Sequence, residues 1–218
     1  MRLFASYVLG DPEGLEAARA DMAMTVRVTR QPYWHWCEYL IDASRLLMRC
    51  ALDEASRTIA EGREVERTFD QRDARVEGPW SLQSFMVRRE AGGLEFARQL
   101  LGAGQVPADT WLPGLVALCT ELGLAEPARA ALRQVLEQDL GRARGSSTWP
   151  AALSFLGEAA CWLGEKEAAR RLLAEAECFA GLNLMGAEFL APIGSAERLL
   201  AMLKGALALP GVEDDFAA

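Results

Sequence analysis

The residues best suited to chemistry in this sequence are a single histidine, scattered carboxylates and several arginines. His35 is the only histidine, and Glu38 follows three positions later, so both side chains can share one face of a helix. The pair lacks the H-E-x-x-H spacing of zinc peptidases. The alternative is a histidine at a boundary between packed helices. We therefore expect no catalytic residue and no metal site here.

Pairs of carboxylates recur along the chain, and paired carboxylates are the usual machinery of acid–base catalysis. They are Glu61 and Glu64, Asp70 and Asp73, and Glu165 and Glu167. Such catalysis needs the two groups to converge in a desolvated cleft that separates their pKa values. These pairs fall on polar helix faces or in linkers, which favours solvated surface. The sequence therefore predicts a protein that is not an enzyme and needs no cofactor.

Arginines occur in two clusters that suit anionic ligands. Arg88 and Arg89 end one predicted helix, and Arg142 and Arg144 lie in a glycine-rich segment. Guanidinium groups bind carboxylates and phosphates through paired hydrogen bonds. The alternative is compensation of a helix dipole by the first cluster and solvation of the second.

Aromatic residues gather near the start of successive predicted helices. They are Tyr33, Trp34 and Trp36, then Trp80, Trp111 and Trp149. Aromatic and arginine side chains are typical anchors for a bound peptide or helix. The alternative is that the rings pack between neighbouring helices. As interaction residues the sequence predicts Tyr33, Trp34, Trp80, Arg88, Trp111 and Trp149.

Composition limits the classes of function. The 218 residues carry a net charge of -8, whereas nucleic-acid binding draws on a basic surface, so we expect no nucleic-acid partner. No stretch of some 18 uncharged apolar residues occurs, and no membrane span is expected. The N-terminal apolar run is too short for a signal peptide. The five cysteines form no C-x-x-C pair, which favours reduced core thiols in a cytoplasmic protein.

A short pattern recurs at a nearly constant spacing and indicates how these residues are positioned. A small residue is followed three positions later by glutamate, starting at Gly10, Ala51, Gly92, Gly123 and Gly164, with anchors 41, 41, 31 and 41 residues apart. A fixed period in this range is typical of arrays of helix pairs. Helical periodicity dominates throughout, and no strand pattern is apparent.

The pattern predicts five helix pairs and an incomplete sixth. The ranges are 2–9 and 12–29, 33–50 and 53–68, 72–90 and 93–102, 107–122 and 124–139, 149–163 and 165–179, and a last helix at 195–207. Gly78-Pro79 delays the fifth helix to Trp80, and 141–147 is predicted as a flexible loop. Residues 1–208 are expected to form one domain, and 209–218 a mobile acidic tail.

Spacing in the fifth pair is that of a tetratricopeptide repeat. Its positions are Leu153, Leu156-Gly157, Ala160, Leu163-Gly164, Ala169, Leu173 and Ala176. Small residues allow two antiparallel helices to approach closely, and large ones fill the remaining space. Arg19 and Ala60 stand where the pattern asks for a large apolar residue. The predicted fold is an all-α, right-handed superhelical array of antiparallel helix pairs, a tetratricopeptide-like solenoid.

The order of segments resembles a known helical region. The segments are GDPEGLEAARADM, RQPYWHW, SFMVRREAGGLEFARQLL, LVALCTELGLAEPARAALRQVL and STWPAALSFLGEAACWLGEKEAARRLL. They are similar to the C-terminal tetratricopeptide-like array of bacterial signalling regulators, where a cyclase-like or DNA-binding module precedes a P-loop ATPase and the repeats. The chain has no G-x-x-x-x-G-K-[ST] motif. The resemblance therefore implies a detached sensor or scaffold region without catalytic residues.

Three functions follow as hypotheses. The first is a regulatory module that binds a protein or peptide in a concave groove. The second is a small-ligand sensor with an apolar cavity near Trp34, Trp36 and His35, and the third is an enzyme of unknown type. An unpaired last helix would also expose Leu199, Leu200, Met202 and Leu203, which predicts a homodimer or a domain contact at that end.

Overall fold

The computed structural model of the chain is mostly helical, in agreement with the predicted class. It describes residues 2–69, 79–102, 110–138, 140–187, 191–210 and 212. They divide into two compact units, which we call the first unit (Met1–Gly93 with Glu188–Pro192) and the second unit (Leu94–Ala187 with Ile193–Ala218). That residues 1–208 form one domain stays a prediction. Most of the predicted tail, together with Asp70, Asp73 and Pro107, lies outside the described residues.

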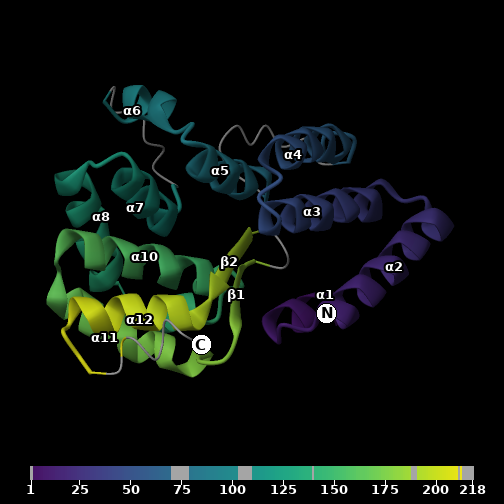
Figure 1. The fold of residues 1–218 in the computed structure, drawn as a ribbon. Coiled ribbons are helices and arrows are strands. Elements are labelled where there is room, and N and C mark those ends of the chain that lie inside the picture. Colours follow the sequence, from purple (N-terminus) through teal and green to yellow (C-terminus); the bar gives the residue numbers. More distant parts are fainter. Residues whose placement is uncertain are drawn as a thin grey trace. The chain divides into compact units, whose positions relative to one another are not determined.

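The described residues of the first unit form five helices in the predicted order (Figure 1). They are α1 (Arg2–Val8), α2 (Pro12–Thr29), α3 (Pro32–Met48), α4 (Leu52–Glu66) and α5 (Pro79–Ala91). The side chain of Asp11 accepts a hydrogen bond from the backbone N–H of Gly14 at 2.9 Å and so caps the start of α2. At the start of α4, Ala51 occupies the cap position, and Asp53 lies in the first turn.

Helix α3 is the centre of the first unit. It packs against α2, α4 and α5 and buries Leu40, Ile41, Ala43, Ser44 and Leu47. A helix that is apolar on most sides is buried by neighbours on most sides. The apolar sequence of α3 agrees with its position among three other helices.

Two polar links fix the neighbours of α3. From α5, the buried Gln83 donates its amide hydrogens to the Leu40 carbonyl at 2.8 Å and to the Ser44 hydroxyl at 3.1 Å. From α2, Arg19 donates two hydrogen bonds to Asp42, at 2.7 and 2.9 Å. This ion pair explains why Arg19 departs from the repeat pattern, since its charge is used to join two helices.

Within the described residues, the second unit contains seven α-helices, a short 3-10 helix and strand β1. Its elements are α6 (Glu95–Gly102), α7 (Leu112–Glu121), α8 (Ala125–Glu137), α9 (Leu140–Arg144), α10 (Trp149–Leu163), α11 (Lys166–Ala176), the 3-10 helix at Glu177–Phe179, β1 (Asn183–Gly186) and α12 (Ala196–Ala206). Strand β2 (Ala191–Ser195) begins in the segment assigned to the first unit and ends in the second. The predicted flexible loop at 141–147 is wrong in its first half, because α9 continues to Arg144. There Arg144 forms an ion pair with Glu175.

Helix α10 is the core of the second unit. It is covered by α7, α11, α12 and β1, and Leu153, Phe155 and Leu156 are no more than 1% exposed. The chain turns into α8 at Gly123 and into α11 at Gly164, where φ is +68° and +69°. Glycine is the residue that adopts this left-handed conformation without steric cost. Across these turns α7 packs against α8, and α10 packs against α11.

The strands were not expected from the sequence. β1 and β2 form a two-stranded sheet, and β1 packs against α10. Leu184, Met185 and Gly186 of β1 are all buried. Alternation of apolar and polar residues arises only when one face of a strand is solvated, so this strand carries no such signal.

The exposed face predicted for the last helix is also wrong. α12 packs against α10 and α11, and Leu199, Leu200 and Leu203 are at most 5% exposed. These side chains are covered within the chain, so the expected homodimer loses the apolar surface on which it depended.

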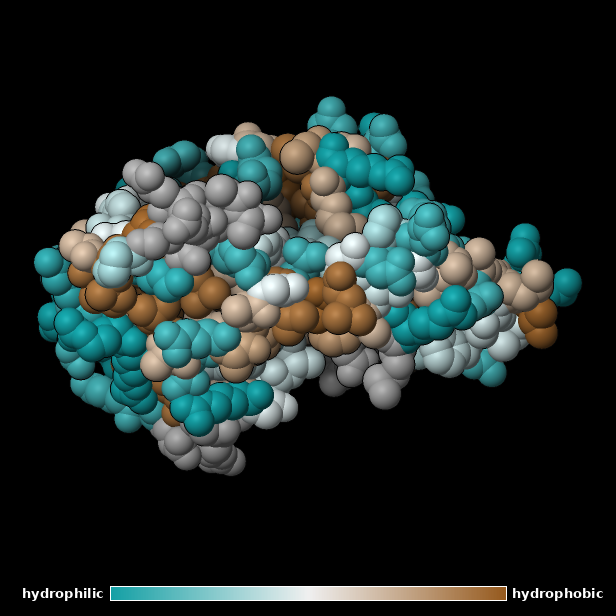
Figure 2. Space-filling view, turned by 60° about the horizontal axis from the view of Figure 1, so that its bottom comes forward, coloured by the Kyte–Doolittle hydropathy of each residue, from teal (hydrophilic) through white to brown (hydrophobic). Residues whose placement is uncertain are grey.

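Apolar and polar residues are interspersed on the face shown in Figure 2. Exposed large apolar side chains occur in both units, and they include Leu9, Met24, Val28, Tyr33, Phe96 and Trp162. Among the described residues, no helix combines the length and the apolar character needed to cross a bilayer.

We predict that Gly157→Val destabilises the second unit. A Cβ at Gly157 would lie 2.6 Å from Leu199 Cδ1, and overpacking of this kind costs about 1–3 kcal/mol. Urea unfolding would measure it. Gly205→Ala is the matched control, because its Cβ meets its nearest neighbour at 3.7 Å. Equal stability of wild type and Gly157→Val would show that α10 and α12 are not closely packed.

Candidate functional site

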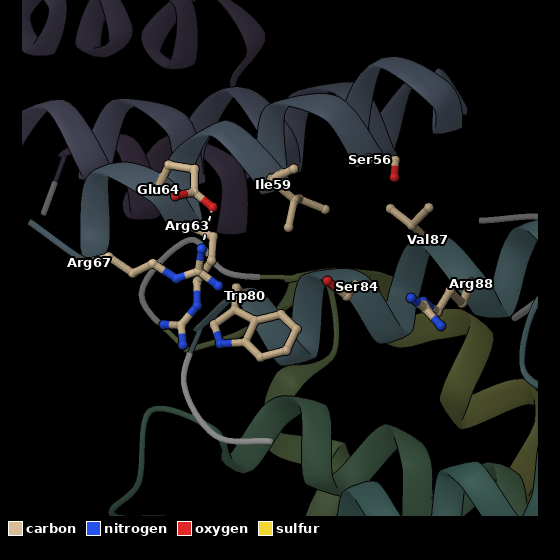
Figure 3. Close-up of a pocket in the computed structure, with 10 residues that line it drawn as sticks. Ser56, Ile59, Arg63, Glu64, Arg67, Trp80, Ser84, Val87 and Arg88 are labelled. Atoms are coloured by element: carbon tan, nitrogen blue, oxygen red, sulfur yellow. Dashed lines mark hydrogen bonds and ion pairs between the residues drawn. The ribbon is translucent and has the colours of Figure 1, made fainter. Parts of the chain in front are cut away.

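A hollow of about 310 Å³ lies between α4 and α5 in the first unit (Figure 3). From α4 and its C-terminal end it is lined by Ser56, Ile59, Ala60, Arg63, Glu64 and Arg67. From α5 it is lined by Trp80, Ser84, Val87 and Arg88. The structure thus brings together two residues that the sequence singled out, Trp80 and Arg88.

Helical spacing explains how both sets of side chains reach the hollow. The α4 residues recur every three or four positions, as do those of α5, so each set forms one stripe along its helix. Ala60 lies in the middle of the α4 stripe, where the repeat pattern asks for a large apolar side chain. The small side chain leaves space between α4 and α5, and the neighbouring side chains of both helices line this space.

Arg63 and Trp80 contact each other across the hollow. The Arg63 guanidinium carbon lies 5.1 Å from the centre of the Trp80 ring, within the range of a cation–π interaction. Arg63 also forms an ion pair with Glu66, and the two side chains are 15% and 8% exposed. The stacking and the ion pair together hold the guanidinium plane over the indole.

Trp80 has an unsatisfied donor. Its indole Nε1 is buried and has no hydrogen-bond partner among the described residues. A buried N–H without an acceptor costs free energy, and most such groups in proteins are paired.

Charged side chains lie at both ends of the hollow. At the Trp80 end, Arg63 pairs with Glu66 and Arg67 pairs with Glu64. Arg88 lies toward the other end, beyond Ser84, and is exposed (Figure 3). The charged residues that line the hollow are Arg63, Arg67, Arg88 and Glu64.

The other predicted interaction residues lie elsewhere. Tyr33 and Trp34 contact each other edge to face at 5.2 Å, and Tyr33 also contacts Trp36 and Phe69. Trp111, in the second unit, is 37% exposed and contacts Phe155. Trp149 is 4% exposed and part of the core around α10, so its ring is not available to a ligand. These residues are not part of the hollow.

His35 lines a second hollow of the first unit. This space of about 420 Å³ is bounded by Val26, Arg30, Gln31, Pro32, His35, Val65 and Thr68. The side chain of His35 is exposed, and its ring lies 5.0 Å from that of Tyr39. Trp34 and Trp36, which were predicted to share a cavity with His35, are not among the lining residues.

Three of the predicted carboxylates form ion pairs with arginines. Glu64 pairs with Arg67, Glu165 with Arg129, and Glu167 with Arg170. In the part of the chain that the structure describes, no group of three or more His, Cys, Asp or Glu could hold a metal ion. The side chain of Arg142 lies outside the described residues.

Sequence reasoning missed Arg63, Arg67 and the two serines of the hollow. The signal was present on α4: two arginines four positions apart, preceded by the small Ala60, lie on one face. That stripe becomes informative only when the facing helix is known, because a row of charges on one helix is normally solvated surface.

Comparison with models of known protein families, with curated proteins and with solved structures finds no match to this chain. The arguments for its function therefore rest on the residues and the geometry described above.

We predict that Arg63→Met lowers the free energy of unfolding of the first unit by about 1–3 kcal/mol, because Glu66 would remain buried without its partner. Arg67→Met is the matched control: Arg67 and Glu64 are 59% and 69% exposed, and exposed pairs contribute less than about 1 kcal/mol. Chemical denaturation of both variants would measure the difference. Equal effects would show that the Arg63–Glu66 pair is solvated.

The cysteines allow a second test, on reactivity. Burial raises the pKa of the Cys37, Cys119 and Cys161 thiols, whereas Cys50 and Cys178 are exposed. Only the thiolate is nucleophilic, so each unit of raised pKa lowers reactivity about tenfold at neutral pH. Alkylation with iodoacetamide, followed by mass spectrometry, should modify Cys50 and Cys178 first. In denaturant all five should react alike, and equal rates in the native protein would contradict the assignment.

Proposed function

We propose that the chain is a non-enzymatic module that binds a peptide or protein segment in the hollow between α4 and α5. The observation that carries the proposal is the stacked Arg63–Trp80 pair, with its buried and unsatisfied indole N–H, beside an apolar floor. Aromatic and arginine side chains at the centre of a recess are the residues that contribute most to binding energy.

The size and lining of the hollow support a side chain or short segment as the ligand. Its volume is at the lower end of the range for ligand sites, about 300–1,000 Å³. Ile59 and Val87 are apolar and mostly buried, while Ser56 and Ser84 offer hydroxyl groups. Such a mixture orients a peptide through a few polar contacts and stabilises it by apolar contact.

The wider architecture belongs to the same proposal. Consecutive helices pack as pairs, α1 with α2, α3 with α4, α7 with α8 and α10 with α11. We propose that these pairs form a right-handed, tetratricopeptide-like superhelix, and that the module has a regulatory or scaffold role in bacterial signalling. Arrays of helix pairs commonly present extended binding surfaces, which supports a binding role.

Small-ligand sensing is the second candidate. The hollow beside His35 favours it, since its volume of about 420 Å³ is also within the range for ligand sites. A sensor would show a ligand-dependent rise in melting temperature that His35→Ala removes. Peptide binding between α4 and α5 would not depend on His35.

We predict that a random peptide library displayed on phage yields sequences enriched by the wild-type chain. Enrichment should be lost with the double variant Arg67→Glu, Arg88→Glu, because both changes place carboxylates where the hollow has guanidinium groups. Arg57→Glu is the control, since Arg57 is an exposed residue of α4 that does not line the hollow. Circular dichroism would verify that each variant is folded.

Two outcomes would contradict the proposal. Either no sequence is enriched by the wild type, or the same sequences are enriched by the double variant.

A further inference from the structure

The hollow beside His35 lies where three helices of the first unit meet. Its lining residues come from the end of α2, the start of α3 and the end of α4. It shares no described residue with the hollow between α4 and α5. The two hollows are therefore separate candidate sites, and each can bind a ligand of its own kind.

Arg30 and His35 supply the groups of this hollow that are best suited to an anion. Both residues are exposed, so a ligand can reach them from solvent. In the described part of the chain, the Arg30 side chain makes no hydrogen bond or ion pair, and no aspartate or glutamate lines the hollow. A guanidinium group binds a carboxylate through two parallel hydrogen bonds, and an imidazole can donate an N–H in either protonation state.

The turn between α2 and α3 does not itself call for an arginine. Arg30 follows α2 in the left-handed conformation, with φ at 51° and ψ at 27°. Glycine is the usual residue in this position, because a Cβ raises the energy of the conformation. A positive charge also interacts favourably with the C-terminal end of a helix dipole, but Arg27 in the last turn of α2 already supplies one.

Apolar side chains form much of the remaining wall. Val26, Pro32 and Val65 belong to α2, α3 and α4 respectively, and their side chains offer only hydrocarbon to a ligand. The volume of about 420 Å³ is within the range of ligand sites, about 300–1,000 Å³. A ligand that fills this space therefore needs an apolar body in addition to an anionic group.

The charge of the lining suits one carboxylate better than a phosphate. Two helices end beside the hollow and one begins there, so the partial charges of the helix ends offset each other in part. The guanidinium group of Arg30 then sets the charge preference. A phosphate ester carries a charge of about -1.5 to -2 at neutral pH, and placing that charge beside an apolar wall costs more than placing a single charge there.

We infer that the hollow beside His35 binds a small monocarboxylic acid, with its carboxylate at Arg30 and His35 and its apolar body against Val26 and Val65. The inference goes beyond the peptide site between α4 and α5. It rests on the second candidate function, small-ligand sensing, and names the class of ligand. Because the hollows share no described residue, failure of the inference leaves the proposed peptide binding to its own test.

The test is a nuclear magnetic resonance titration of the full-length chain with 3-phenylpropionate. An acid of this size in an open hollow binds weakly, with a Kd on the order of 1 mM, and chemical shifts measure such binding directly. Matched probes keep the phenyl body and replace the carboxylate by a primary amide, an amine or a phosphate ester, while acetate keeps the carboxylate and lacks the body. His35 is the only histidine of the chain, so its ring resonances are identified without mutation and report on the hollow.

We expect 3-phenylpropionate to bind about three- to tenfold more tightly than its amide and than acetate, as a partly solvated charge pair and a modest apolar contact allow. Arg30→Gln and Arg30→Gly should remove the preference over the amide, and Arg30→Lys should keep part of it. Glycine suits the left-handed turn, so the loss in Arg30→Gly would not come from a disrupted fold. Arg27→Gln is the matched control and should keep the preference, since Arg27 does not line the hollow.

The affinities of the probes can overturn the inference in three ways. Equal affinity for the acid and its amide would show that the carboxylate is not recognised, and equal affinity for the acid and acetate would show the same for the apolar body. Tighter binding of the phosphate ester or the amine would assign a different charge to the ligand. Tighter binding of N-acetyl-alanyl-phenylalanine would assign the carboxylate to the end of a peptide chain.

Two further results would also contradict it. Equal loss of the preference in Arg27→Gln and Arg30→Gln would reduce the effect to the general charge of this helix end. Absence of a saturable shift of the His35 ring with 3-phenylpropionate at up to about 10 mM, ten times the expected Kd, would show that the hollow does not bind acids of this class.

Discussion

The placement of α5 on α3 is the constraint on which the rest of the first unit depends. A single amide side chain, Gln83, donates to the Leu40 carbonyl and to Ser44 in an interior with almost no solvent access. Hydrogen bonds in such surroundings are stronger and far more costly to break than on a surface. They fix the position of α5 along its own axis relative to α4. In that position Trp80 lies next to Arg63, and Arg88 lines the same hollow.

Departures from the repeat pattern are informative in this chain. Arg19 and Ala60 both replace a large apolar residue, yet with opposite consequences. Arg19 restores the contact between helices by a two-pronged ion pair with Asp42. Ala60 restores nothing and leaves the space that becomes the hollow. A broken local rule without compensation is typical of functional positions, and this contrast is why we place the site at α4 and α5.

The sequence allowed most of the helices to be located, because apolar periodicity and glycine turns are local signals, although α9 was predicted as part of a loop and α7 begins later than expected. It also indicated Trp80 and Arg88. It did not show which residues face them: Arg63 and Arg67 belong to a stripe whose meaning depends on a helix that follows some twelve or more residues later. Trp149 and the leucines of α12 were predicted to be exposed for a related reason. The apolar character of a helix face predicts that the face is buried, but it does not identify the element that buries it. The buried strand β1 has no alternation from which it could be recognised.

The small side chain of Ala60 has a consequence for how this protein tolerates change. A larger side chain at this exposed position would project into the hollow. Changes at position 60 therefore alter the hollow more than they alter the packed interior of the first unit.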